Sequence, residues 1–183
     1  MHPPSSLFLL AAALLCCALD AAAQAHGHGP EAHETHGKPY AGFTGRDIKA
    51  LSPRELAGLA EGHGLGMALA AELNGYPGPR HVLDLADELA LTAPQRAAVQ
   101  AAFDAMDTKA RALGEEVIAL ERELDRAFAD RTVTPAKLDE LVDAIGKRRA
   151  RLRAVHLAAH LEVADVLSAE QRARYDRARG YAE

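Results

Sequence analysis

Two matching motifs, Leu91-Thr92-Ala93-Pro94-Gln95 and Leu167-Ser168-Ala169-Glu170-Gln171, enclose the stretch of sequence that decides the fold. Each has the pattern of a capping box. In such a box a Thr or Ser side chain accepts a hydrogen bond from the backbone N–H three residues later, and the Gln there bonds back to the cap. We therefore predict that Thr92 with Gln95, and Ser168 with Gln171, are structural caps that each start a helix.

The stretch between the two motifs has the pattern of two long amphipathic helices. Apolar residues follow the first motif at steps of four and three, the spacing of a helix buried along one side; they are Val99, Phe103, Met106, Ala110, Leu113, Val117, Leu120, Leu124 and Phe128. Thr134 and Pro135 then supply the cap and the first position of a second helix. The short break between them predicts an antiparallel helical hairpin, with its core at about residues 91–168, and an all-α fold.

Shorter helices are expected before the hairpin. Ser52-Pro53-Arg54-Glu55 is another capping box and predicts a helix that runs to Leu73, although Gly62, Gly64 and Gly66 weaken its middle. A short helix is expected over residues 81–89. Because two helices cannot enclose their own apolar seam, flanking helices and a homodimer are predicted to complete the core.

The first 25 residues have the composition of a signal peptide. The apolar segment over residues 7–19 is too short to span a bilayer, and small residues allow cleavage after Ala23 or Ala25. An uncleaved membrane anchor is the alternative; after cleavage no stable membrane insertion is expected. Cys16 and Cys17 leave with the signal, so the mature chain has no thiol for disulfide or metal chemistry.

Charge and motifs exclude several classes of function. The net charge of −5 argues against a nucleic-acid partner, which would favour a basic protein. The chain has no Gly-x-Ser-x-Gly, no His-Glu-x-x-His and no phosphate-binding loop. We therefore expect a binding protein rather than an enzyme.

Histidines dominate the segment after the signal. We expect residues 26–50 to form a flexible tail, because Gly, Pro and charge are frequent there, and residues 51–183 to form the helical domain. The tail carries His26, His28, His33 and His36, a composition typical of metal binding. The alternative is a solvated tail with incidental affinity for metal ions.

His156 and His160 form the second candidate site. They are four residues apart on a helix, so both rings project from one face and can share an ion. In an antiparallel hairpin that turns near residue 132, partner positions sum to roughly 264. His156 is then expected beside Asp107 or Thr108, and His160 beside Asp104. Such a set would suit Zn, Ni or Co; the alternative is a pair of surface histidines that bond to nearby acids.

A basic run lies on the same predicted helix. The register sets Glu115 and Glu116 against its first three members, and the whole run comprises Lys147, Arg148, Arg149, Arg151 and Arg153. From the residues alone, the interpretation is a solvated flank of salt bridges, each worth at most about 1 kcal/mol.

A helical hairpin with a Leu-Thr/Ser-x-x-Gln box at each end, behind a signal peptide and a His-rich segment, resembles the Spy/CpxP-like LTxxQ family and its periplasmic heavy-metal sensor and resistance branch. The resemblance covers residues 80–180, and Ser168 stands where the family usually has Thr. It implies a Gram-negative periplasmic protein that responds to a divalent transition metal: Zn, Ni, Co or Cu.

The same resemblance leaves other functions open. An ATP-independent chaperone or envelope-stress regulator would bind unfolded clients through the basic run and nearby apolar surface. An inner-membrane signalling partner is a further expectation for this family. A structural envelope module with incidental histidines is the third interpretation.

Overall fold

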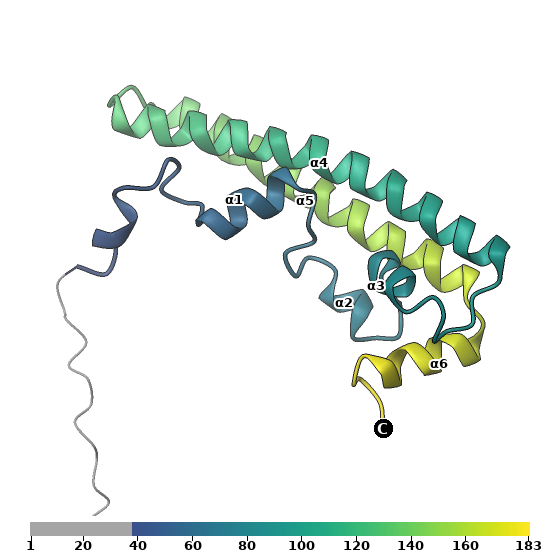
Figure 1. Ribbon diagram of the computed structural model, residues 1–183. Coiled ribbons are helices and arrows are strands. Elements are labelled where there is room, and N and C mark those ends of the chain that lie inside the picture. Colours follow the sequence, from purple (N-terminus) through teal and green to yellow (C-terminus); the bar gives the residue numbers. More distant parts are fainter. Residues whose placement is uncertain (1–37) are drawn as a thin grey trace, which may run out of the picture. The chain divides into compact units, whose positions relative to one another are not determined.

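Two long antiparallel helices form the centre of the fold (Figure 1). The computed structural model describes residues 38–183, in which α4 (Ala93–Ala129) and α5 (Pro135–Val166) pack against each other. No strand occurs within this range. The predicted all-α helical hairpin is therefore confirmed, whereas the homodimer stays a prediction.

The predicted caps start the helices at the expected residues. Thr92 Oγ1 accepts a hydrogen bond from the Gln95 backbone N–H at 3.3 Å, and Ser168 Oγ accepts one from the Gln171 N–H at 3.2 Å. In both boxes the Gln Oε1 accepts from the backbone N–H of the cap residue, which completes the reciprocal pair. Thr92 thus starts α4, and Ser168 starts α6 (Ala169–Ala178).

The register of the hairpin is the one that the sequence predicted. The guanidinium of Arg148 on α5 forms an ion pair with the Glu116 carboxylate on α4. Their positions have the predicted sum of roughly 264 for an antiparallel pair that turns near residue 132. This register also places His156 and Asp107 on facing parts of the two helices.

Three short helices pack against the hairpin: α1 (Pro53–Ala60), α2 (Leu69–Glu72) and α3 (Pro79–Asp84). α1 contacts α4, α2 contacts α5, and α3 contacts both (Figure 1). They bury two apolar clusters. The first consists of Ile48, Leu51, Leu59, Ala110, Val117, Ile118 and Leu152. The second consists of Val82, Leu89, Val99, Ala102, Val163, Leu167 and Tyr175.

Gly114 permits the close approach of α1 to α4. A Cβ atom at this position would lie 2.0 Å from the carbonyl oxygen of Leu59. Only a residue without a side chain fits there, so the backbone of α1 rests directly on α4. Because Leu59 lies at the end of α1, this contact also fixes where the chain turns away from the hairpin.

The single helix predicted from Ser52 to Leu73 is wrong. α1 ends at Ala60, and Gly62 and Gly66 adopt left-handed conformations with φ of 71° and 80°. Glycine takes this conformation without a steric cost, so the Gly-rich segment forms turns instead of a helix. The next predicted helix is also shorter than expected, because α3 ends at Asp84 and not at residue 89.

The predicted seam is buried unevenly. Val99, Ala110 and Val117 are fully buried, whereas Phe128 near the hairpin turn is 55% exposed. The remaining seam residues of α4 are half-buried; these are Phe103, Met106, Leu113, Leu120 and Leu124. The reason is that α1, α2 and α3 cover one side of the hairpin, and part of the seam faces the other side.

The N-terminal part of the sequence lies mostly outside the described residues. The predicted signal peptide and the tail residues His26, His28, His33 and His36 fall there. Ile48, within the segment that we expected to be a flexible tail, is buried in the first apolar cluster. No helix within residues 38–183 has the length and apolar character needed to cross a membrane.

Candidate functional site

His156 and His160 lie on the side of α5 that the short helices cover. Their exposed fractions are only 4% and 8%, so the alternative of two surface histidines is wrong. Both belong to the face of α5 that also carries the fully buried Leu152 and Val163. The i, i+4 spacing directs the two rings to the same side of the helix, as predicted.

The ring of His160 is fixed by a backbone carbonyl. Its Nδ1 lies 2.7 Å from the Tyr76 carbonyl oxygen, which can only accept a hydrogen bond, so Nδ1 carries the proton. In the neutral imidazole the other nitrogen, Nε2, then has a free lone pair. A Cβ atom at Gly78 would lie 3.1 Å from this Nε2, so the backbone of the segment after α2 passes directly over the ring.

His156 has a buried nitrogen without a partner. Within residues 38–183, its Nε2 is the one fully buried side-chain nitrogen or oxygen that makes no hydrogen bond. Burial lowers the pKa of His156 below its usual value, neighbouring His160 lowers it further, and Asp107 opposes the shift. The imidazole is therefore neutral near pH 7 and offers a lone pair to a ligand.

Every histidine of residues 38–183 lines the same pocket, which has a volume of about 500 Å³. His156 and His160 line it from α5. His63 lines it from the segment before α2, and His81 lines it from α3. The side chains of His63 and His81 are 61% and 44% exposed, so they lie at the rim. No local pattern in the sequence connects His63 or His81 with the pair on α5.

The two acids predicted beside the histidines have different positions. Asp107 lines the pocket, where it forms an ion pair with Arg111 at 2.7 Å. Asp104 is exposed and accepts a hydrogen bond from Gln100 at 2.8 Å, and it does not line the pocket. Among the described residues, no group of three or more His, Cys, Asp or Glu side chains has the spacing of a complete metal site.

Glu72 is a buried acidic residue beside the pocket that the sequence did not reveal. This carboxylate is 7% exposed, and its Oε2 lies 3.8 Å from His160 Nδ1. Oε2 also accepts the Gly78 backbone N–H at 3.1 Å. A Glu in the Gly-rich region has no sequence signal for such a role, because its partners lie on α5, on α6 and after α6.

The predicted basic run is largely paired with acids. Lys147 bonds to Asp143 at 2.6 Å, Arg149 to Glu121 at 2.8 Å, and Arg148 to Glu116. Arg151 and Arg153 form no ion pair within the described part of the chain. Arg153 borders a separate pocket of about 640 Å³ whose lining includes Leu59 and Met67.

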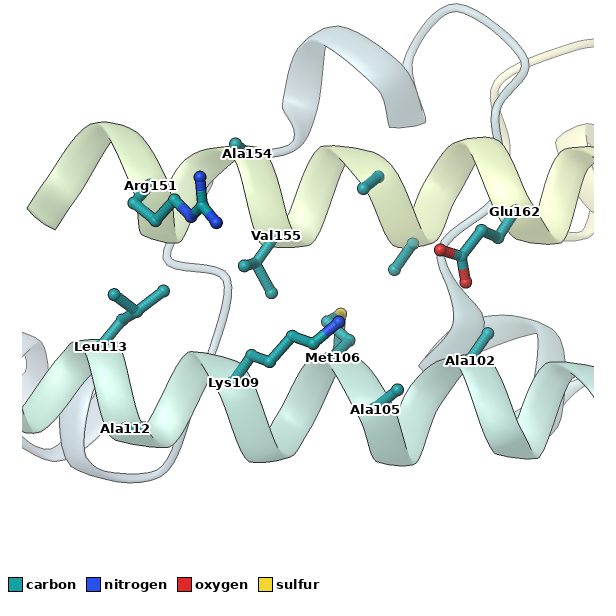
Figure 2. Close-up of a pocket in the computed structure, with 12 residues that line it drawn as sticks. Ala102, Ala105, Met106, Lys109, Ala112, Leu113, Arg151, Ala154, Val155 and Glu162 are labelled. Carbon is teal, nitrogen blue, oxygen red and sulfur yellow. The ribbon is translucent and has the colours of Figure 1, made fainter.

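A groove of about 490 Å³ lies between α4 and α5 and is lined only by residues of these two helices. Alanines of both helices line it, and Figure 2 shows Arg151 toward one end and Glu162 toward the other. Lys109 extends into the groove from α4. This is the side of the seam on which Met106 and Leu113 stay half-buried.

Fold and site together define an all-α helical-hairpin protein with a buried histidine pair and two Leu-Thr/Ser-x-x-Gln caps. The model of the heavy-metal resistance family matches residues 62–174, which is more than half of the chain. The protein belongs to this family, and the resemblance to the Spy/CpxP-like LTxxQ type is confirmed. Neither the curated proteins nor the solved structures gave a match.

Proposed function

We propose that the protein binds a divalent transition-metal ion in the histidine pocket and uses this binding in heavy-metal resistance or sensing. Membership of the heavy-metal resistance family supports a metal-related role. The observation that carries the proposal is the unpartnered, buried Nε2 of His156 beside His160. Buried polar groups normally have partners, so an orphaned imidazole nitrogen is explained well by a ligand.

The chemistry of the two histidines fits a metal ion. A metal-binding His commonly donates its other N–H to a carbonyl or carboxylate, which fixes the tautomer and the ring. His160 does this through the Tyr76 carbonyl. Neutral imidazoles suit Zn, Ni, Co and Cu alike, so the chemistry of the site defines a class of ions rather than a single metal.

His156 and His160 would be the fixed part of such a site. Two imidazoles do not complete a coordination sphere, and further ligands would come from water or from the rim histidines His63 and His81. Asp107 would contribute negative charge nearby, although its pairing with Arg111 argues against direct ligation. We therefore expect an open site that exchanges metal rather than a closed structural one.

The tail adds a second candidate site for metal. His26, His28, His33 and His36 can bind an ion without a fold, so their contribution must be removed before the pocket is measured. A full-length variant with these four residues replaced by Ser does so and keeps the chain length. We expect the tail to bind more weakly than the pocket, because the sequence predicts a flexible segment, which would lose conformational freedom on binding.

Calorimetric titration of this tail variant with ZnCl₂, NiCl₂, CoCl₂ and CuSO₄ tests the proposal. We expect one site per chain with an affinity tighter than about millimolar, and loss of that site in His156→Leu. Leu fills a similar volume and has no donor nitrogen, so the fold should persist. A tail variant that binds none of the four ions would contradict the proposed function.

The groove between α4 and α5 and the separate pocket beside Arg153 favour a second candidate function. Arg151 and Arg153, which have no acidic partner within residues 38–183, border concave surfaces with apolar linings. We propose as the alternative that these surfaces bind unfolded clients, as an ATP-independent chaperone of the family would. The protein should then suppress the aggregation of an unfolded model substrate, and Arg153→Glu should weaken this effect. Equal suppression by the parent and by Arg153→Glu would contradict this role.

A periplasmic location and an inner-membrane signalling partner complete the proposal. Both follow from the predicted signal peptide and from the sensor-type relatives that the sequence resembles. Fractionation of cells that express the full chain would check the location. We expect to recover the protein in the periplasmic fraction, with its mass lowered by that of a signal peptide of about 25 residues.

A further inference from the structure

A network of side chains joins the histidine pocket to the segment after α6, and its centre is Glu72. The Glu72 Oε1 accepts a hydrogen bond from the Tyr175 hydroxyl at 2.6 Å and another from the Tyr181 hydroxyl at 3.0 Å. Tyr175 belongs to α6 and Tyr181 follows it. Residues more than 100 positions from Glu72 thus hold one of its two oxygens.

Glu72 has several polar and charged partners in spite of its burial. The Nε of Arg179 lies 3.6 Å from Oε1, which adds a partly exposed cation to the two phenol donors. Tyr175 is fully buried, and burial together with the bond to Glu72 raises the pKa of its phenol, so it remains a donor. A buried carboxylate with this many partners is costly to release from any one of them.

The other oxygen of Glu72 faces the pocket. Oε2 accepts the Gly78 backbone N–H, and the carbonyl of nearby Tyr76 accepts the His160 Nδ1–H. Glu72 therefore holds the short segment that orients the His160 ring. The backbone of Gly78 passes so close to the ring that a shift of this segment would displace His160 Nε2.

We infer that Glu72 is a positioning residue of the histidine pocket, and that Tyr175 and Tyr181 support the pocket by holding the Glu72 carboxylate. This inference rests on the proposed metal-binding function. Partners that orient a ligand histidine are typically worth about 10- to 100-fold in metal affinity. Because coupling is reciprocal, an ion held by His160 also stabilises the contacts of Tyr175 and Tyr181 with Glu72.

Two single-atom changes test the network. In the full-length tail variant, Tyr181→Phe and Tyr175→Phe each remove one hydroxyl donor to Glu72 and leave the ring in place. We expect each to weaken Zn²⁺ binding by about 10-fold in calorimetric titration. Tyr181 is partly exposed, so its variant keeps the test valid even if the change at Tyr175 disturbs the second apolar cluster.

A second measurement separates positioning from a general loss of stability. The parent for these measurements is the full-length tail variant. Addition of ZnCl₂ to it should slow hydrogen exchange over residues 175–181, and this protection should be lost in Tyr181→Phe. Leu167→Ala is the matched control, because it destabilises the same cluster without touching Glu72. The control should keep the Zn²⁺ affinity and the zinc-dependent protection.

The outcomes distinguish this inference from the proposed function. If Zn²⁺ binding depends on His156 but both Tyr variants bind as tightly as the parent, the role of Glu72 is wrong and the metal site stands. An equal loss of affinity in Leu167→Ala and in the Tyr variants would also overturn the inference. If the tail variant binds none of the four ions, the proposed function fails and the inference fails with it.

Discussion

Gln95 and Gln171 exchange a reciprocal pair of side-chain hydrogen bonds. Gln95 Nε2 donates to Gln171 Oε1 at 2.9 Å, and Gln171 Nε2 donates to Gln95 Oε1 at 3.1 Å. The amide of Gln95 also donates to the Val166 carbonyl, and that of Gln171 to the Leu89 carbonyl. The two glutamines thus close their own capping boxes and join the start of α4 to the end of α5.

This pair predicts that the two motifs are energetically coupled. Gln95→Ala should lower the free energy of unfolding by about 1–3 kcal/mol, because part-buried carbonyl and amide groups lose their partners. In a double-mutant cycle with Gln171→Ala, the two losses should fail to add by about 0.5–3 kcal/mol. Urea denaturation of the four proteins measures both quantities.

Gln100→Ala is the control for that cycle. Gln100 lies on the exposed face of α4 and, within residues 38–183, its side chain bonds only to exposed Asp104. Its loss should change stability by less than about 0.5 kcal/mol. If the losses in Gln95→Ala and Gln171→Ala are additive, the two motifs at the open end of the hairpin are not energetically coupled.

Two glycines of the hairpin should respond in opposite ways to alanine. Gly114→Ala places a Cβ against the Leu59 carbonyl and must push α1 away from α4, which should cost about 1–3 kcal/mol. Gly146 on α5 has no atom within 4 Å of an added Cβ. Gly146→Ala should therefore stabilise the protein by about 0.5–1 kcal/mol through helix propensity.

Thermal or urea unfolding of the two variants compares them directly. Both changes add one methyl group to a long helix, so they differ only in what that methyl group meets. A neutral Gly114→Ala would show that α1 does not rest on α4 at this point.

The buried His156 predicts a loss of stability in acid. Its pKa is lowered in the folded state, so the unfolded chain binds a proton more readily, and stability rises with pH. The contribution of neutral His156 is complete above the unfolded pKa of about 6.5. It is lost progressively as the pH falls from there toward the lower pKa of the folded state.

Urea denaturation of metal-free protein at pH 7.5 and pH 5 checks this dependence. The parent should lose more stability over this interval than His156→Leu, which has no proton to gain at that position. The difference between the two losses isolates His156 from the other groups that titrate in the same range. Equal losses in the parent and the variant would show that His156 is not held neutral by the fold.

The groove between α4 and α5 predicts a site for a second copy of the chain. Arg151 and Glu162 lie at its two ends, and neither forms an ion pair within residues 38–183 (Figure 2). If an antiparallel copy of α5 lies along the groove, Arg151 of each copy faces Glu162 of the other. The alanines between them allow the helices to approach closely, and the copy would cover the half-buried Met106 and Leu113.

Charge reversal tests this arrangement by sedimentation velocity. Arg151→Glu alone and Glu162→Arg alone each bring like charges together, so each variant should be monomeric. A mixture of the two variants should form a heterodimer, and the double variant should recover the homodimer. A parent that is monomeric at about 100 µM, well above ordinary micromolar affinities, would contradict the prediction.

Sequence alone determined the hairpin, its caps and its register. These features depend on local patterns: a capping box spans four residues, and an apolar stripe repeats every three or four. The turn near residue 132 then sets which residues face each other, as the ion pair of Glu116 and Arg148 shows. The same geometry correctly placed Asp107 near His156.

Only the tertiary structure decided which polar groups surround the histidines. The register also placed Asp104 beside His160, but that carboxylate faces solvent because position in a register does not fix the direction of a side chain. The path of the Gly-rich segment between α1 and α3 buries His156 and His160, brings His63 and His81 to the same pocket, and sets Glu72 against Tyr175. Contacts over such separations depend on how irregular turns pack, and no local periodicity encodes them.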